Sequence, residues 1–116
     1  MRKTLRQAFT LVEIMIVVLI IGVLLAIAVP NFIRARESSQ AKACVSNLKQ
    51  IDSAKEQLAM DAKLGAGATI TNGMTDLLTY IKKEPSCPSG GAYTVGTIGT
   101  DPTCSHGGTG ATAHAL

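Results

Sequence analysis

Aromatic residues are scarce in this chain of 116 residues. It has no tryptophan, and its aromatic side chains are Phe9, Phe32, Tyr80 and Tyr93. The two phenylalanines are the only aromatic residues in the first 64 positions. This sequence therefore argues against a function that conducts electrons along stacked aromatic rings.

Positive charge is also lacking from most of the chain. The formal net charge is +3, and the three residues responsible for it, Arg2, Lys3 and Arg6, all precede residue 9. The remaining residues carry eight basic and eight acidic side chains, so they are neutral overall. A nucleic-acid-binding surface would need a basic patch on the folded part of the chain. The sequence therefore predicts no direct nucleic-acid site.

Motifs for catalysis and cofactor binding are absent from the sequence as well. There is no Gly-rich phosphate loop after a strand and no paired nucleophile and base. Asp76, Glu84 and Asp101 are too few and too spread along the chain to predict a calcium site. We therefore expect a protein that is not an enzyme and needs no cofactor.

The most prominent feature of the sequence is the apolar run FTLVEIMIVVLIIGVLLAIAVP, residues 9–30. As a helix it is about 30 Å long, which is enough to cross the hydrocarbon core of a bilayer. The basic residues before it predict an N-terminus that stays in the cytoplasm. Glu13 lies inside the run, although a carboxylate costs about 2.5–3.5 kcal/mol at the centre of a membrane helix.

Three interpretations of this run differ in what they make of Glu13. A secretory signal peptide would be cut after Ala28, where a small-x-small stretch ends, but the run is long for that class. A single-pass membrane anchor explains the length and the orientation, yet it leaves the carboxylate unexplained. A segment that packs against copies of itself in a filament would provide Glu13 with a cationic partner.

The residues after Pro30 continue in a helical pattern. No Gly or Pro occurs from residue 31 to 64, and apolar residues recur there at helical spacing. They are Ile33, Ala41, Cys44, Leu48, Ile51, Leu58 and Ala62. Lys55 interrupts this stripe, and its amine is expected to reach solvent. We predict one helix from residue 9 to about 64, weakened at Gly22, kinked at Pro30 and ended by Gly65.

The residues after this helix predict a small head. The stretch MTDLLTYIKK, residues 74–83, predicts a short helix that Pro85 ends, and residues 91–105 are typical of a β-hairpin with its turn at 99–102. The Gly- and Ala-rich tail after about residue 107 is expected to be flexible. The predicted fold class is α+β, with a long kinked N-terminal helix and a head made of a short helix and a β-hairpin.

The stretch RQAFTLVEIMIVVLIIGVLLAIAVPNF resembles the N-terminus of type IV pilins and type II secretion pseudopilins. In that family a membrane aspartyl peptidase cuts a short basic leader immediately before a Phe and then methylates the new N-terminus. The resemblance implies cleavage between Ala8 and Phe9 and N-methylation of Phe9. The family usually has Gly before the cut, and Ala8 is another small residue. The implied segments are a leader (1–8), a membrane and filament-core helix (9–30), an amphipathic stalk (31–64) and a head (65–116).

The resemblance also implies roles for three residues of the apolar run. Glu13 becomes the fifth mature residue, and its implied partner is the free Phe9 ammonium of a neighbouring subunit. Gly22 and Pro30 match positions that bracket a stretch which unwinds in assembled filaments of the family. The implied function is a structural subunit of a type IV pilus or pseudopilus-like filament. The alternative is a small secreted or surface-anchored binding protein that signal peptidase releases after Ala28.

The partners implied by the resemblance follow from how such filaments are built. They are copies of this chain, the prepilin peptidase, an assembly ATPase and a platform protein of the inner membrane. The precursor is expected in the inner membrane, and the mature subunit in an extracellular or periplasm-spanning filament.

Three cysteines in so short a chain predict an oxidising compartment, but their number is odd. Cys87 and Cys104 flank the predicted hairpin, and a disulfide between them would contribute about 3 kcal/mol of stability in the chain-entropy account. Cys44 lies on the apolar stripe and is interpreted as a small buried residue, although a pairing that includes it stays open. A zinc site made of Cys87, Cys104 and His106 would have irregular spacing and only three ligands, so we predict no metal.

Overall fold

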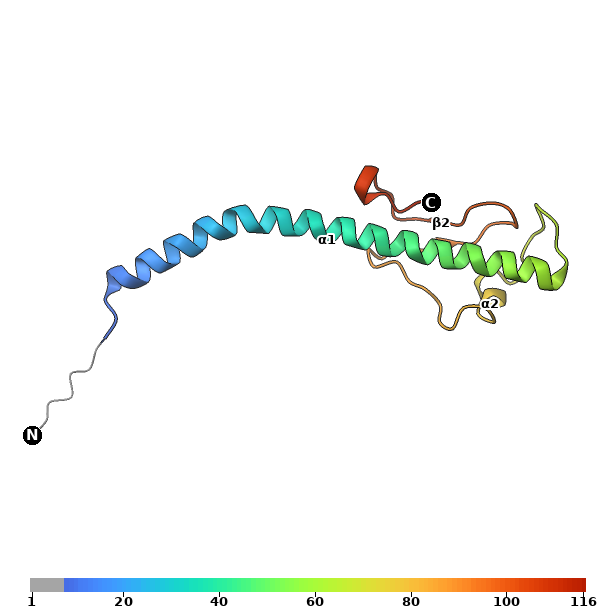
Figure 1. Cartoon of the computed structure of the whole chain (residues 1–116), viewed down its shortest axis with the longest axis horizontal. Helices are drawn as coiled ribbons and strands as arrows, with labels where there is room; N and C mark the ends of the chain where they lie inside the picture. The colour runs from blue at the N-terminus through green and yellow to red at the C-terminus, as the bar shows by residue number, and fades with distance from the viewer. Residues whose placement is uncertain (1–7) are drawn as a thin grey trace, which may run out of the picture. The chain divides into compact units, whose positions relative to one another are not determined.

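The computed structural model describes residues 8–116, in which a long helix precedes several short elements (Figure 1). Helix α1 spans Leu11–Ala62, and the one-turn helix α2 spans Met74–Leu77. Strands β1, Tyr93–Thr94, and β2, Thr103–Cys104, form an antiparallel pair, and the 3-10 helix η1 spans Gly110–Thr112. These elements confirm the predicted α+β fold class. The basic residues of the implied leader, which precede Gln7, lie outside the described residues.

The chain divides into two compact units, Met1–Ala35 and Arg36–Leu116, and α1 contributes to both. Every described side chain of the first unit is exposed to solvent. The helix runs without interruption through Gly22 and Pro30, although Pro30 has no N–H to donate to the preceding turn. The kink at Pro30 and the unwinding between these two residues stay predictions.

The C-terminal end of α1 differs from the prediction that Gly65 ends it. The helix ends at Ala62, and Lys63 adopts a left-handed φ of 53°. The Leu64 N–H then donates to the Ala59 carbonyl at 2.9 Å, which is the longer-range bond of a Schellman cap. Lys63 therefore takes the position that a glycine usually fills, and Gly65 lies two residues beyond it.

The second half of α1 provides one side of the core of the head. Its buried residues lie on one face of the helix: Ala41, Cys44, Leu48, Ile51, Ala54, Lys55 and Ala59. The predicted stripe is correct for four of these residues. It is wrong for Ile33 and Ala62, which are exposed, while Leu58 is half-buried.

Two hydrophobic clusters make up this core. One is built from Ile51, Ala54, Leu77 and Val95, and the other from Cys44, Leu48 and Cys87. The half-buried ring of Tyr93 packs against both clusters and so joins them. Each cluster takes residues from α1 and from segments more than 20 positions later in the sequence, so the head is held together by long-range contacts.

Helix α2 and the hairpin are both shorter than predicted. Helix α2 ends at Leu77 instead of reaching Pro85, and the N–H groups of Tyr80 and Ile81 both donate to the Leu77 carbonyl at 2.9 Å in the turn that follows. In the hairpin, Tyr93 lies opposite Cys104. The connection between the two strands covers residues 95–102, and the predicted turn at 99–102 is only its second half.

The C-terminal tail carries η1 and then buries His114, which is 5% exposed. Gly108 has a φ of 141°, and a Cβ there would lie 2.0 Å from the carbonyl oxygen of Thr112. Only glycine fits such a close approach of two backbone segments. The flexibility expected after about residue 107 stays a prediction, but the tail does pack a side chain into the head.

Lys55 is fully buried, so the prediction that its amine reaches solvent is wrong. Its Nζ donates hydrogen bonds to the carbonyl oxygens of Val95, at 2.8 Å, and of Thr100. Both carbonyls belong to the connection between β1 and β2. The ammonium therefore ties this connection to α1, and the stripe of α1 is interrupted by a side chain that has partners inside the head.

Replacing Lys55 with methionine is expected to destabilise the head by about 2 kcal/mol at pH 7. The change leaves the buried Val95 carbonyl without a donor, and an unsatisfied buried polar group costs about 1–3 kcal/mol. The matched control is Lys49→Met, because Lys49 is an exposed lysine of the same helix and surface changes stay within about 0.5 kcal/mol. Denaturant unfolding of the full chain in detergent, followed by tyrosine fluorescence, measures the stability change of each variant.

The difference in unfolding free energy between wild type and Lys55→Met should also depend on pH. Burial lowers the pKa of Lys55 below its ordinary value of 10.5. Between the lowered pKa and 10.5 the unfolded chain binds more protons than the folded chain, so wild type gains stability relative to Lys55→Met as the pH rises through that window. Below the lowered pKa the difference is constant. A Lys55→Met protein as stable as wild type at pH 7 and pH 10 would contradict this assignment.

Candidate functional site

The apolar segment of α1 is the largest candidate site in the chain. Its large hydrophobic side chains from Leu11 to Val29 are between 47% and 78% exposed. A window of this helix has a mean hydropathy of 3.1, and by length and composition the helix could cross a membrane. Burying one such side chain is worth about 1.5–3 kcal/mol. Within the described part of the chain nothing covers this surface, so a membrane or another molecule has to do so.

Ala8 and Phe9 lie immediately before α1 and outside any regular element. Both are exposed, and the Phe9 side chain is 85% accessible. A peptide bond outside any helix can enter a protease active site without unwinding a helix first. Cleavage between these two residues stays a prediction.

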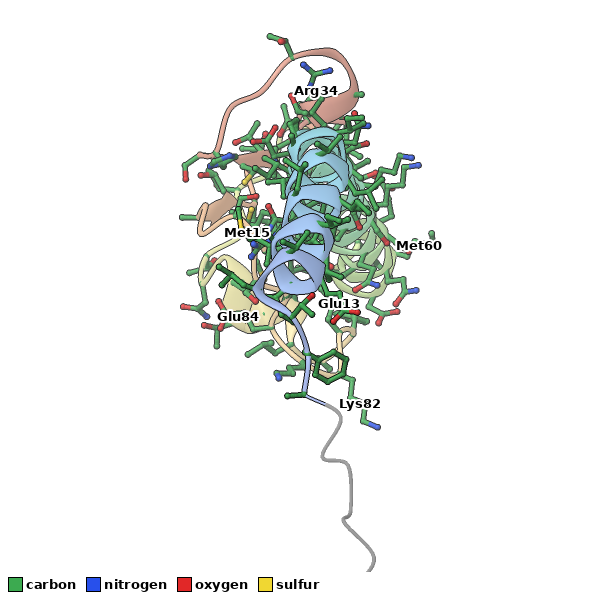
Figure 2. The ribbon with its side chains drawn as sticks, turned by 90° about the vertical axis from the view of Figure 1, so that its left-hand side faces the viewer. Glu13, Met15, Arg34, Met60, Lys82 and Glu84 are labelled. Carbon is green, nitrogen blue, oxygen red and sulfur yellow. The ribbon has the colours of Figure 1, made fainter. Side chains whose placement is uncertain are left out.

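Glu13 forms a capping box with Thr10 at the start of α1. The Thr10 N–H donates to Glu13 Oε2 at 2.8 Å, and the Glu13 N–H donates to Thr10 Oγ1 at 3.3 Å. These bonds satisfy two of the N–H groups that a helix start leaves without partners, and the carboxylate also faces the positive end of the helix dipole. In Figure 2, viewed from the N-terminal side, Glu13 extends from the first turn of the ribbon.

The capping box gives Glu13 a role that the sequence analysis missed. The signal was available, since Thr10 and Glu13 have the T-x-x-E spacing that is typical of a capping box before an apolar run. Oε2 is the only one of its carboxylate oxygens that accepts a hydrogen bond from residues 8–116. Oε1 is therefore available to a donor from another molecule.

Gly22 has open space around it, since a Cβ placed there would meet no heavy atom within 4 Å. Close packing inside the chain therefore does not require glycine at this position. Pro30 is likewise exposed in the second half of the segment. Both residues are unfavourable in the interior of a helix. Relative to Ala, Gly costs about 1 kcal/mol there and Pro about 3 kcal/mol.

The head brings three cysteines and one histidine into a single cluster. Cys44 comes from α1, Cys87 from the segment after α2, Cys104 from β2 and His114 from the tail that follows η1. The four ligand atoms, three Sγ and one ring nitrogen, all lie within 4.8 Å of one another. Cys87 Sγ lies 3.6 Å from His114 Nδ1. Cys87 and Cys104 were predicted to pair, and a pairing with Cys44 was left open, but no sequence signal pointed to His114.

All three cysteines are free thiols in the structure, so the predicted Cys87–Cys104 disulfide stays a prediction. Cys44 and Cys87 are buried and Cys104 is half-buried. His106, the third residue of the zinc combination considered from the sequence, lies outside the cluster and packs its ring against that of His114, with 4.5 Å between ring centroids.

The two buried thiols have different electrostatic environments. Burial raises the pKa of Cys44 to about 12. Burial alone would raise the pKa of Cys87, but the backbone N–H groups of Ser89 and Gly91 and the thiols of Cys104 and Cys44 favour its thiolate, and the net shift of its pKa is downward. Gly91 packs closely here, since a Cβ on it would lie 2.6 Å from Cys104 Sγ.

Comparison with known proteins agrees with the geometry of the N-terminal segment. The prokaryotic N-terminal methylation motif matches residues 3–29. The ComG operon protein 3 homolog of Bacillus licheniformis is 32% identical over 89 residues, which cover 77% of this chain and 89% of that protein. The chain belongs to the type IV pilin and pseudopilin family.

Other relatives of this pilin-family chain come from pili and from secretion systems. Type II secretion system core protein G of Escherichia coli (strain K12) is 31% identical, with 80% of this chain and 74% of that protein covered. Type IV major pilin protein PilA of Myxococcus xanthus is 48% identical over 50 residues, which are 43% of this chain and 23% of that protein. No solved structure matches the chain significantly.

The methylation motif of the pilin-family chain includes Ala8, Phe9, Glu13 and Gly22 and ends one residue before Pro30. The four members of the cysteine–histidine cluster lie outside it. The match therefore concerns the N-terminal segment alone, and it carries no information about the chemistry of the head.

Proposed function

We propose that this chain is a structural subunit of a type IV pilus or pseudopilus-like filament that polymerises through α1. The observation that carries the proposal is the exposed apolar surface of residues 9–33, which no other part of the described chain covers. In the precursor the membrane covers this surface, and in the filament the same surface packs against other subunits. The alternative, a secreted protein released after Ala28, would discard this segment.

Processing precedes assembly in this proposal. The prepilin peptidase cuts between Ala8 and Phe9 and methylates the new Phe9 amine. Cleavage removes Arg2, Lys3 and Arg6, which are the whole formal net positive charge of the chain. Heads of neighbouring subunits can then pack without strong mutual repulsion.

The pairing of Phe9 with Glu13 sets the register of the filament. The ammonium that cleavage creates on an incoming subunit meets the Glu13 carboxylate of a subunit already in place. Either charge alone in an apolar core is costly, and the pair largely offsets that cost. Oε1 of Glu13 can accept this bond while Oε2 keeps the cap on Thr10. A wrong axial offset leaves both charges unpaired, so it is disfavoured.

The remaining partners belong to the assembly machine. They are an assembly ATPase and a platform protein in the inner membrane, and the product is an extracellular or periplasm-spanning filament. Both pili and secretion pseudopili fit the proposal, since relatives with both kinds of name match the chain.

Mass spectrometry of the mature protein, with electron microscopy of sheared fibres, tests the proposed function. The expected mature chain begins with methylated Phe9, and the fibres contain it. A mature chain that begins at Val29 and is found only in the soluble secreted fraction would overturn the proposal. That result would support release by signal peptidase after Ala28.

A further inference from the structure

We propose that Cys44, Cys87, Cys104 and His114 bind one structural zinc ion in the head. This inference is independent of the filament function, because none of the four residues belongs to the apolar segment. Three cysteines and one histidine are a known ligand set of structural zinc sites, which are four-coordinate and tetrahedral. The ion would join α1 to the three segments that pack on it.

The spacing of the four ligand atoms fits a tetrahedral site. With Zn–S near 2.3 Å and Zn–N near 2.0–2.1 Å, the ligand atoms of a tetrahedron lie about 3.5–3.8 Å apart. The Cys87 Sγ to His114 Nδ1 distance of 3.6 Å is within this range. All other separations are at most 4.8 Å, so the cluster has to contract by about 1 Å or less.

The surroundings of the cluster are those of a closed, structural site. Cys44 is 0%, His114 5% and Cys87 7% exposed, Cys104 is half-buried, and Leu48 and Tyr93 pack with these cysteines. Such a site leaves no open position for substrate, which separates structural from catalytic zinc.

Groups outside the ligand set also support the cluster. Cys87 begins the turn Cys87-Pro88-Ser89-Gly90-Gly91, which the Gly90 N–H closes by donating to the Cys87 carbonyl at 3.0 Å. The Tyr93 side chain packs against the Cys44 and Cys87 cluster, and its hydroxyl accepts a hydrogen bond from Asn47 Nδ2 at 3.0 Å. Outer groups of this kind hold metal ligands in place.

A disulfide explains the cluster less completely than a metal does. One disulfide uses two of the three thiols and leaves the third cysteine and the buried histidine without a role. Zinc uses all four side chains at once. Its thiolate ligands release their protons to solvent on binding, and no oxidant is needed. A metal also gives a small head the cross-link that domains of this size often need.

The test uses the full chain purified in detergent, with its purification tag removed. Metal is stripped with a chelator under reducing conditions, and the protein is then loaded with Zn²⁺ or Co²⁺. We expect one zinc per chain by elemental analysis. The Co²⁺ form should show the visible bands of a tetrahedral ion and a strong thiolate-to-metal charge-transfer band. Thermal unfolding of the zinc-loaded chain should shift to higher temperature than that of the stripped chain.

Variants assign the ligands. Cys44→Ala and His114→Ala should each weaken zinc binding about 100-fold or more, since the loss of even an outer-shell partner costs 10–100-fold. His106→Ala is the matched control, because the ring of His106 touches that of His114 but lies outside the ligand set. It should keep one zinc per chain.

Three results would overturn the proposal. The first is wild-type protein that takes up no metal and shows a disulfide in its intact mass. The second is a Co²⁺ form without tetrahedral thiolate bands, and this measurement needs no variant to fold. The third is zinc content that His114→Ala and Cys44→Ala leave unchanged.

Discussion

Glu13→Gln is expected to leave leader cleavage intact and to abolish filaments. Glutamine preserves the capping box, since it can accept the Thr10 N–H as glutamate does, but it cannot neutralise the Phe9 ammonium of the next subunit. The unpaired charge in an apolar core costs about 2.5–3.5 kcal/mol, which is roughly a 100-fold loss in affinity at each subunit addition. Electron microscopy of sheared fibres measures filament formation, and mass spectrometry of the mature N-terminus measures leader cleavage.

Two further variants separate the ion pair from the helix cap. Glu13→Ala removes both and should resemble Glu13→Gln. Thr10→Val keeps the carboxylate but loses the Oγ1 acceptor of the Glu13 N–H, at a cost of about 1 kcal/mol for a lost cap, and it should still assemble. If Glu13→Gln formed normal fibres while Thr10→Val did not, the carboxylate would act as a cap and the register hypothesis would be wrong.

Ala8→Leu is expected to block processing and thereby to prevent assembly. The family resemblance implies a peptidase that accepts a small residue before the cut, and leucine adds bulk at that position. Without cleavage Phe9 has no free ammonium, so Glu13 has no cationic partner in the filament. The three basic residues of the leader also stay attached and resist leaving the cytoplasmic face. Immunoblotting of the precursor and mature forms, with counts of surface fibres, measures the outcome.

Ala8→Gly is the matched control for this change. Glycine is the residue that the family usually has before the cut, so Ala8→Gly should be processed at least as fast as wild type and should form normal fibres. Fibres built from unprocessed Ala8→Leu protein would show that assembly does not require a free Phe9 amine. The proposed pairing with Glu13 would then have to be abandoned.

The N-terminal half of the chain could be predicted because its conformation depends on local sequence. A long apolar run in a membrane forms a helix because the helix pairs its own backbone N–H and C=O groups within the segment, and the described side chains of this segment are exposed. The motif of residues 3–29 likewise depends on consecutive positions. Even here, the capping box on Thr10 was present in the sequence but not recognised.

The head could be predicted only in outline. A short helix and a hairpin follow from turn residues and alternation, but their lengths depend on contacts with α1. Lys55 shows most clearly what local sequence cannot predict. A lysine on an apolar stripe is expected to reach solvent unless buried carbonyls accept hydrogen bonds from its amine. Its acceptors, Val95 and Thr100, are 40 or more positions away, and no local pattern places them there.

The sequence by itself therefore determined the long helix, the implied cleavage point and the carboxylate at Glu13, since each depends on neighbours within a few residues. Only the tertiary structure decided the chemistry of the head. Cys44 is an ordinary small residue on a stripe and His114 is part of a Gly- and Ala-rich tail, so neither gives a signal alone. They meet Cys87 and Cys104 because three segments that follow α1 in the sequence pack on the same face of α1. Long-range packing of this kind depends on the whole chain, and the spacing of residues does not encode it.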